Sequence, residues 1–227
     1  MGFTLDRIVP WGRTFDEYRA MFGLSDGELV RRILGCGDGP ASFNAELTRR
    51  GGSVVSFDPV YAFDAGQIRN RIAETYETVM DQMRRNKDDY VWTSVASVEE
   101  LGRIRMAAMD RFLADYETGK KEGRYVSGEL PVLPFENGSF GLALSSHFLF
   151  LYSDHLSQDF HIRSIEEMLR VADEVRIFPV LTLDGRKSPY LDGVADALAR
   201  SGHAVRLLCV PYEFQRGGYD MMVVRRA

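Results

Sequence analysis

A glycine-rich turn at residues 35–39 (GCGDG) constrains the fold of this chain more than any other part of the sequence. The apolar stretch 30–34 leads into the turn, and residues 40–50 then begin with a proline, carry apolar side chains at helical spacing and end at two glycines. Residues 53–58 (SVVSFD) follow as a short apolar run, which predicts a buried strand. The order of strand, glycine turn, helix and strand predicts a right-handed βαβ unit in a parallel sheet.

Residues 64–122 show no strand-like alternation and are predicted to form two helices. A capping box marks the start of each helix, Asp64 with Gln67 and Ser97 with Glu100. Because a crossover between parallel strands needs only one helix, we interpret 64–122 as a helical insertion. Two placements are open: the insertion forms a lid over a site, or it packs on the outer face of the sheet without a chemical role.

The remaining patterns complete a predicted α/β architecture. Residues 1–27 are expected to form an N-terminal helical cap segment, with a capping box at Thr14 and Glu17. Further strands are predicted at 123–126, 140–145 and 174–178, helices at about 161–172 and 189–201, and an antiparallel hairpin from 204–214 and 219–224. The sequence therefore predicts one domain over 1–227, a Rossmann-like three-layer sandwich. Its seven-stranded sheet is expected to be mostly parallel with an antiparallel C-terminal hairpin, so that one edge strand is reversed.

Length and composition exclude several classes of protein. The 227 residues suffice for one large domain, and 45% hydrophobic with 27% charged residues argue against disorder. No stretch approaches the roughly 18 apolar residues of a membrane span, and the start lacks the order of a secretory signal, so we expect a cytoplasmic protein without a membrane partner. Two cysteines form neither a disulfide framework nor a zinc site, and no metal is predicted. The net charge of −5 argues against nucleic acid as a partner, and a monomer or homodimer is expected.

The glycine turn is a candidate ligand site, because glycines let the backbone approach a ligand and the next helix offers unpaired N–H groups. A phosphate loop needs a lysine after its last glycine, and none follows here, which disfavours ATP or GTP hydrolysis. The dinucleotide fingerprint needs a glycine where this chain has Pro40, which disfavours NAD. Asp58, at the end of the next strand, is placed to accept both hydroxyls of a ribose. An adenosine without a pyrophosphate fits this layout.

Several segments in order strengthen that interpretation: 33–43 (ILGCGDGPASF), 54–58 (VVSFD), 128–135 (GELPVLPF), 137–140 (NGSF) and 145–149 (SSHFL). Together they resemble class I S-adenosylmethionine-dependent methyltransferases, and within them the small-molecule branch of the menaquinone and ubiquinone type. The resemblance covers most of residues 28–227. It implies methyl transfer from S-adenosylmethionine to a small-molecule acceptor, with S-adenosylhomocysteine as the product.

The resemblance also implies a set of cofactor-binding residues. They are Gly35, Cys36, Gly37 and Gly39 of the turn, Asp58 with Pro59, the adenine-contacting acid Glu129 with the adjacent Leu130, and Ser145 with Ser146 at the end of the strand that faces the methyl donor. The family often has an acid two residues before the first glycine, where this chain has Ile33. The methionine amino group must therefore be held by Asp38, by another acid or by backbone carbonyls.

His147 is the candidate catalytic residue, because it lies just past a predicted strand end. Methyl transfer is an in-line displacement that depends mainly on alignment in a dry site, and a base is needed only if the acceptor must lose a proton. Two other roles are open for His147, packing against cofactor or substrate and a purely structural one. His155 and His161 lie in a polar stretch and are expected to be solvent-exposed.

Aromatic residues are the candidates for the acceptor site: Trp11, Phe15, Tyr18, Tyr152 and Tyr212. Their ring faces would favour a cationic sulfonium. The alternative is that they fasten the amino-terminal helix and the loops onto the core.

A second function is also open, a catalytically silent methyltransferase fold that binds a nucleoside or a protein partner, which the absence of an acid at Ile33 allows. Methylation of protein or RNA is disfavoured by the net charge and by the lack of an Asn/Asp-Pro-Pro-Tyr/Phe sequence after Ser145.

Overall fold

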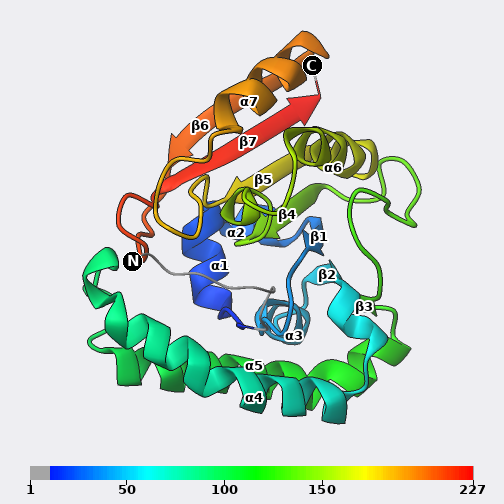
Figure 1. The fold of residues 1–227 in the computed structure, drawn as a ribbon. Helices are drawn as coiled ribbons and strands as arrows, with labels where there is room; N and C mark the ends of the chain where they lie inside the picture. The colour runs from blue at the N-terminus through cyan, green and yellow to red at the C-terminus, as the bar shows by residue number, and fades with distance from the viewer. Residues whose placement is uncertain (1–10, 227) are drawn as a thin grey trace.

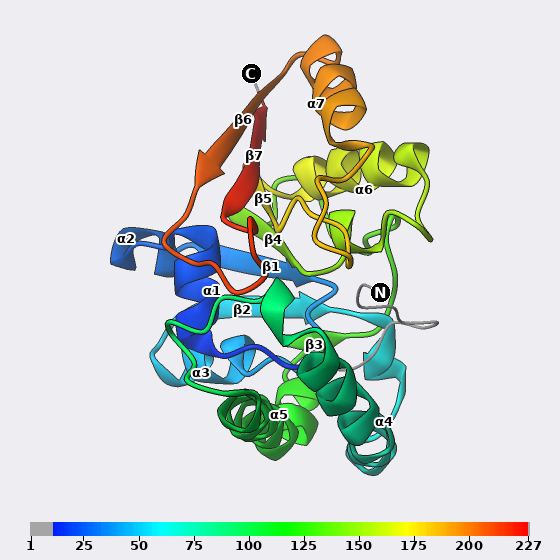
Figure 2. The ribbon, with the colours of Figure 1, turned by 60° about the vertical axis from the view of Figure 1, so that its left-hand side comes forward.

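A seven-stranded sheet runs through the molecule and carries helices on both faces (Figure 1, Figure 2). The computed structural model describes residues 11–226. The strand order is β3-β2-β1-β4-β5-β7-β6. The strands are β1 (Arg32–Cys36), β2 (Ser53–Phe57), β3 (Tyr125–Val126), β4 (Leu142–Ser146), β5 (Glu174–Phe178), β6 (His203–Cys209) and β7 (Asp220–Arg226).

The predicted α/β class is confirmed, including the mostly parallel seven-stranded sheet and its antiparallel C-terminal hairpin. Neighbouring strands from β3 to β5 are parallel, and β7 is antiparallel to both β5 and β6. One detail of the prediction is wrong, because the reversed strand β7 lies inside the sheet and not at its edge. β7 pairs with β5 on one side and with β6 on the other, and its apolar residues 221–224 are all buried, whereas the edge strand β6 is largely exposed. Residues 210–219 join the two strands as a long loop.

The helices follow the predicted capping signals closely. They are α1 (Phe15–Phe22), α2 (Asp26–Leu29), α3 (Phe43–Arg49), α4 (Ala65–Arg85), α5 (Val98–Lys121), α6 (Gln158–Val171) and α7 (Leu191–Arg200), with short 3₁₀ segments η1 (Pro59–Ala62), η2 (Lys87–Asp89) and η3 (Phe150–Tyr152). The capping boxes that precede α1 and α4 are present. At α5 the Ser97 side chain accepts from the Glu100 N–H, but the Glu100 carboxylate accepts from Ala96 instead of closing the box. Residues 1–10 of the predicted cap segment 1–27, and residue 227, lie outside the described residues.

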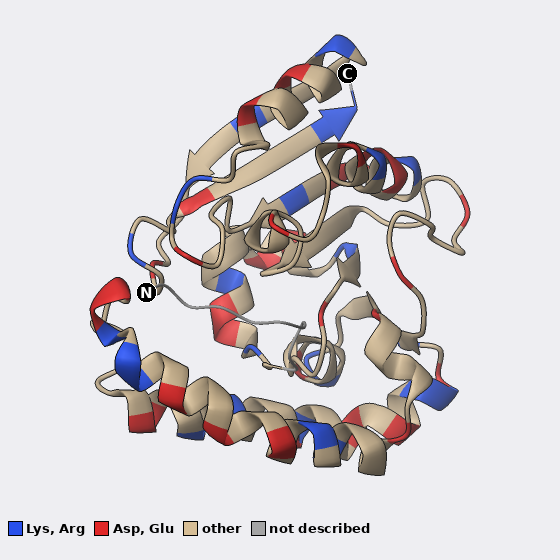
Figure 3. Cartoon of the chain, viewed as in Figure 1, with Lys and Arg blue, Asp and Glu red and all other residues tan. Residues whose placement is uncertain are grey.

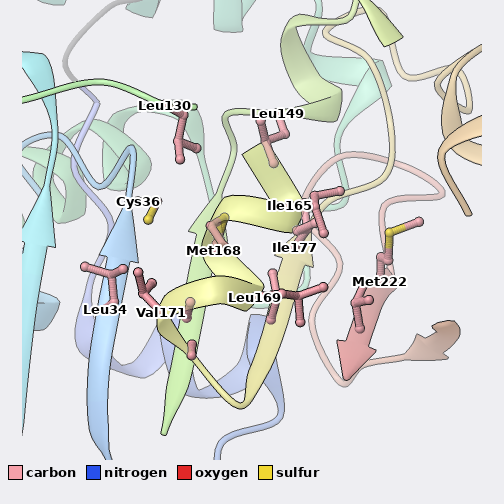
Figure 4. Packing of buried hydrophobic residues seen from close by; sticks show 14 of the residues in the cluster. Leu34, Cys36, Leu130, Leu149, Ile165, Met168, Leu169, Val171, Ile177 and Met222 are labelled. Atoms are coloured by element: carbon pink, nitrogen blue, oxygen red, sulfur yellow. The ribbon is translucent and has the colours of Figure 1, made fainter. Parts of the chain in front are cut away.

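Two apolar layers hold the helices on the sheet. On one face, α6 and α7 pack against side chains of β1, β4, β5 and β7, as Figure 4 shows for Leu34, Met168, Leu169 and Ile177. On the other face, α1 and α3 pack on alternate residues of the same strands. The Tyr18 and Phe43 rings of this second layer stack with centroids 4.5 Å apart. Both faces of the parallel strands are therefore covered, as expected for a doubly wound sheet.

One histidine prediction is wrong. His155 is exposed as expected, but His161 is fully buried. His161 shares the sheet-facing side of α6 with Ile165 and Met168, because positions four and seven residues apart lie on one face of a helix. Its Nδ1 lies 2.7 Å from the Ser157 carbonyl oxygen, and burial lowers its pKa below the ordinary 6.5. The polar residues around His161 belong to the outer face of the helix.

The predicted insertion consists of α4 and α5, which leave the sheet after β2 and return to it at β3 (Figure 1, Figure 2). α5 lies against α3 and β3, and α4 lies beside α5. The connection between the two helices is fastened to the β6–β7 loop, since Val91 donates to the Phe214 carbonyl at 2.7 Å and Arg216 donates to the Asp89 carbonyl at 2.9 Å. The helical pair is thus held at the sheet, where it joins β2 and β3, and at the connection between its two helices. Its movement as a lid stays a prediction.

Acidic and basic residues are interspersed along α4 and α5 (Figure 3). Some of them pair, such as Arg84 with Asp81 at 2.8 Å. Across residues 11–226, none of the helices combines the length and the apolar character that a bilayer crossing needs. The compartment of the protein stays a prediction.

Candidate functional site

A cavity of about 760 Å³ lies where β1, β2, β3 and β4 end. Its strand-end wall consists of the segments that directly follow these strands, residues 37–40, 57–60, 128–131 and 146–148. Opposite it lies a second wall that includes Trp11, Arg13, Val79, Met83, Tyr90, Phe214 and Gln215, from the amino-terminal segment, α4, the α4–α5 connection and the β6–β7 loop. Open α/β sheets bind ligands outside the carboxyl ends of their strands, so this cavity is the candidate functional site.

The glycine turn exposes bare backbone to the cavity. Gly37 and Gly39 line it with φ angles of +73° and +54°, a region that favours glycine. A Cβ at Gly39 would meet no other heavy atom within 4 Å, so the space beside this residue is open. Gly35 has a different reason: its Cα lies against the Asp38 carboxylate, and a Cβ there would collide with it.

Asp38 is a buried carboxylate in the strand-end wall, only 8% exposed. Its Oδ1 accepts from the Tyr18 hydroxyl at 2.7 Å and its Oδ2 accepts from the Ser56 hydroxyl at 2.6 Å. Burial raises the pKa of Asp38 to about 6, although both hydrogen bonds favour the ionised form. Asp38 therefore changes its charge near neutrality, and each of its oxygens keeps acceptor capacity for a ligand.

Asp58 follows β2 and is held by backbone groups on both of its oxygens. Its Oδ2 accepts from the Gly39 N–H at 2.9 Å and its Oδ1 accepts from the Val60 N–H at 2.8 Å. Burial raises its pKa, and these two bonds act in the opposite sense. The carboxylate is thus fixed as a fork on the cavity wall, and each oxygen can accept one more hydrogen bond. Two neighbouring hydroxyls of a ligand would match this fork.

His147 follows β4 in a left-handed backbone conformation, with φ of +52°, and no other non-glycine residue within 11–226 has a positive φ. Its N–H donates to the Phe178 carbonyl at 2.7 Å, and its Nδ1 is hydrogen-bonded to the Ser146 hydroxyl at 3.0 Å. Burial, followed by the positive charges of Arg13 and Arg105, lowers the pKa of His147 well below 6.5. The imidazole is therefore neutral at pH 7, and its lowered pKa makes it a weak base.

A charged cluster lies beside α1 and acts electrostatically on Arg13, a residue of the cavity lining. Arg105 of α5 is 1% exposed and forms an ion pair with Glu17 of α1. Burial alone would raise the pKa of Glu17, but the charge and hydrogen bond of Arg105, with the charge of Arg13, outweigh it and place the pKa far below its ordinary value. Tyr212 of the β6–β7 loop donates to Glu17 at 2.9 Å. The cluster therefore ties the insertion and the loop to the amino-terminal helix.

The cavity brings together most of the residues that the sequence singles out. Those that line it are Trp11, Tyr18, Gly37, Gly39, Asp58, Pro59, Glu129, Leu130, Ser146, His147 and Tyr152. Their roles stay predictions, but their proximity is a property of the fold.

Five of the candidates do not line the cavity: Gly35, Cys36, Ser145, Phe15 and Tyr212. Cys36 points into the core under α6, where burial raises the pKa of its thiol well above the ordinary value (Figure 4). Ser145 is fully buried within β4. Phe15 stacks on Phe43 with centroids 5.7 Å apart, and Tyr212 bonds Glu17, so these two rings fasten α1 and the β6–β7 loop to the molecule.

Sequence reasoning missed most of the second wall. Val79 and Met83 appear in the sequence as ordinary apolar positions of a helix, and nothing local marks Tyr90. Phe214, an aromatic residue with the same two interpretations as Tyr212, does line the cavity. Arg13 directly precedes the capping box of α1, and no pattern shows that its side chain reaches a cavity. Over the described part of the chain, no group of three His, Cys, Asp or Glu side chains is arranged to hold a metal ion.

The fold and the cavity define a doubly wound α/β protein with a candidate ligand site at the carboxyl ends of its strands. No family model matches the chain. The chain is 32% identical over 223 residues to the uncharacterized protein MJ0045 of Methanocaldococcus jannaschii, in an alignment that covers 98% of each chain. This chain belongs to the family of that protein.

Two solved structures are also similar to this chain. One is magnesium protoporphyrin IX methyltransferase (ChlM) from Synechocystis PCC 6803 with bound SAH, 14% identical, with 94% of this chain and 82% of that chain covered and a TM-score of 0.47. The other is a SAM dependent methyltransferase from Aquifex aeolicus, 16% identical, with 92% and 87% covered and a TM-score of 0.42. The fold of this chain is established by its own sheet, which has seven strands, is mostly parallel and carries an antiparallel C-terminal hairpin, as the resemblance to class I methyltransferases implies. The menaquinone and ubiquinone branch stays a prediction.

Proposed function

We propose that this protein is an S-adenosylmethionine-dependent methyltransferase that acts on a small-molecule acceptor. The observation that carries the proposal is the pairing of bare backbone at Gly37 and Gly39 with the fixed carboxylate fork of Asp58, side by side in one cavity. An adenosine needs such a fork for its ribose hydroxyls and room for its chain along the turn. The turn lacks the lysine of a phosphate loop and the third glycine of a dinucleotide site, which disfavours ATP, GTP and NAD as ligands.

The strand-end wall offers a place for each part of the cofactor. Asp58 would accept the ribose hydroxyls, and Glu129 with Leu130 would lie beside the adenine. Asp38, ionised above a pH of about 6, would attract the positively charged amino group. Ser146 and His147 would then face the methyl end, because they close the wall at the end of β4.

Methyl transfer mainly requires that the protein align the acceptor atom with the methyl group and sulfur of the cofactor and exclude water. A nucleophilic atom of the acceptor forms a bond to the methyl carbon while the carbon–sulfur bond breaks and its electron pair stays on sulfur. His147, which is unprotonated at pH 7, would accept the proton that a hydroxyl acceptor loses; its lowered pKa makes it a weak base, so this role suits an acceptor that loses its proton readily. The apolar second wall keeps the reacting atoms away from bulk water.

Isothermal titration of the full chain with S-adenosylmethionine and S-adenosylhomocysteine tests the proposal. We expect both to bind, and Asp58→Ala to weaken binding by about 1–3 kcal/mol, since each Asp58 oxygen loses a ligand hydrogen bond. Asp110→Ala is the matched control, because Asp110 is an exposed residue of α5. Absence of binding at millimolar ligand would refute the proposal.

Turnover separates the enzyme from the catalytically silent alternative. The protein is incubated with S-adenosylmethionine and a panel of hydroxyl, amine and thiol acceptors, and S-adenosylhomocysteine is measured. Formation of the product above the acceptor-free rate supports the enzyme. Tight cofactor binding with no product across the panel favours a binding protein that has kept the fold.

A further inference from the structure

Arg13 is held beside the glycine turn by its own backbone. Its carbonyl oxygen accepts from the Ser42 N–H at 2.9 Å, just before α3 begins. The preceding Gly12 lies so close to the Pro40 carbonyl and the Met109 side chain that a Cβ there would collide with both. These contacts fix the segment that carries Arg13, and its side chain lines the cavity next to the strand-end wall.

The Arg13 guanidinium has no partner that matches its charge. Its Nε and Nη1 atoms are buried and make no hydrogen bond, and within residues 11–226 Arg13 takes part in no ion pair. Burial, and then the positive charge of Arg105, lower its pKa, yet an arginine stays protonated at neutral pH. Buried charges and buried donors in folded proteins are normally paired, so this guanidinium calls for an anionic oxygen group.

The nearest acid of the cluster cannot supply that group. Oε2 of Glu17 accepts from the Thr14 N–H at 2.9 Å, from the Thr14 hydroxyl at 3.1 Å and from Arg105. Its Oε1 accepts from the Tyr212 hydroxyl at 2.9 Å. The cluster therefore holds two guanidinium groups and one fully engaged carboxylate, and one positive charge is left uncompensated beside the cavity.

A second arginine in the cavity wall shows what an arginine without such a role looks like. Arg71 of α4 also lines the cavity, but it is exposed and pairs with Glu74 at 3.3 Å. Solvent and Glu74 already satisfy it. The contrast with Arg13 provides a matched control from the same cavity.

We propose that Arg13 is a carboxylate-binding residue of the cavity, which takes a carboxylate of a bound molecule in the two-pronged geometry that a guanidinium offers. Two sources of this group fit, the amino-acid end of the cofactor and an acid group on the acceptor. The first source rests on the proposed function. The second does not, since it requires only an acidic molecule in an otherwise apolar second wall.

The first arm of the test compares S-adenosylhomocysteine with its decarboxylated analogue, which lacks only the carboxylate. If the cofactor is the source, the wild-type protein binds S-adenosylhomocysteine at least about tenfold more tightly than the analogue. Arg13→Gln removes that preference, and Arg71→Gln keeps it. Arg13→Lys, which retains the charge, restores part of it and serves if the glutamine variant does not fold.

The second arm compares 2-naphthoate with its neutral isostere 2-naphthamide, by titration of the free protein and of the protein saturated with S-adenosylhomocysteine. If the acceptor is the source, the acid binds at least about tenfold more tightly than the amide, and Arg13→Gln abolishes the difference.

A carboxylate preference that depends on Arg13 in either arm supports the proposal and identifies the source. Loss of the preference in Arg71→Gln and not in Arg13→Gln overturns it, as does the absence of any preference in both arms. Failure of S-adenosylhomocysteine to bind at all refutes the proposed function instead, while the naphthoate titration of the free protein still decides the role of Arg13.

Discussion

The two walls of the cavity are built in opposite ways. The strand-end wall consists of short segments that directly follow parallel strands, and it presents backbone groups and the hydrogen-bonded carboxylates of Asp38 and Asp58. The second wall comes from the amino-terminal segment, the helix α4 and two loops that are distant in sequence, and most of its side chains are apolar. Fixed polar groups suit a ligand that is the same in every related protein, such as a cofactor. An apolar surface built from loops and an inserted helix suits a ligand that differs from one protein to the next. We therefore propose that the strand-end wall holds most of the cofactor and that the apolar part of the second wall faces the acceptor.

Apart from Asp58→Ala, the largest effect on cofactor affinity is expected at Gly39. Alanine there adopts an unfavourable left-handed conformation, which costs about 1–2 kcal/mol of stability, and places a methyl group in open space beside the turn. Gly138→Ala is the matched control, because Gly138 has a similar φ of +65° and open space around it on a distant turn. We expect both variants to lose similar thermal stability, and Gly39→Ala alone to weaken S-adenosylhomocysteine binding by about tenfold or more, about 1.4 kcal/mol. Equal affinities would remove the cofactor from this wall.

A smaller effect is expected from the titration of Asp38. Its pKa of about 6 means that it is protonated below that pH and ionised above it. A cationic ligand binds the ionised form better, so the affinity for S-adenosylmethionine should rise as pH increases from 5 to 7.5, by about fivefold or about 1 kcal/mol. Titrations at several pH values measure this rise, and Asp38→Asn should flatten it. A profile that is unchanged in the variant would assign the dependence to another group.

The smallest effect on cofactor affinity is expected in the second wall. Met83 is 3% exposed and lines the cavity from α4. Met83→Ala should lower the free energy of unfolding by about 2 kcal/mol or more through lost packing, yet leave S-adenosylhomocysteine affinity within about twofold. Denaturant unfolding and calorimetric titration measure the two quantities on the same protein. A large loss of cofactor affinity would show that the division between the walls is wrong.

The same division explains what the sequence could and could not predict. The strand-end wall can be predicted from local patterns. A few consecutive residues suffice to predict the glycine turn, the strand before Asp58 and the strand before His147. Where parallel strands end, the fold itself brings these segments to one place. Most of the elements, and the capping boxes of α1 and α4, are local in the same sense.

The second wall depends on contacts between segments that share no local signal. Tyr90 and Phe214 meet because the α4–α5 connection pairs with the β6–β7 loop, and their ring centroids are 4.9 Å apart. The position of β7 inside the sheet likewise depends on its pairing with β5, which precedes it in the chain by about 40 residues and which no local pattern predicts. The polar sequence neighbours of His161 predict solvent exposure, but the burial of a helical side chain depends on which face of the helix meets the sheet.

The insertion also has a consequence for how such proteins diversify. α4 and α5 depart from β2 and rejoin the sheet at β3, the strand immediately beside it. A helical pair with this connectivity can be lengthened, shortened or exchanged without altering the register of any other strand. Changes confined to this one segment would alter the ligand cavity where α4 lines it and leave the strand-end wall in place.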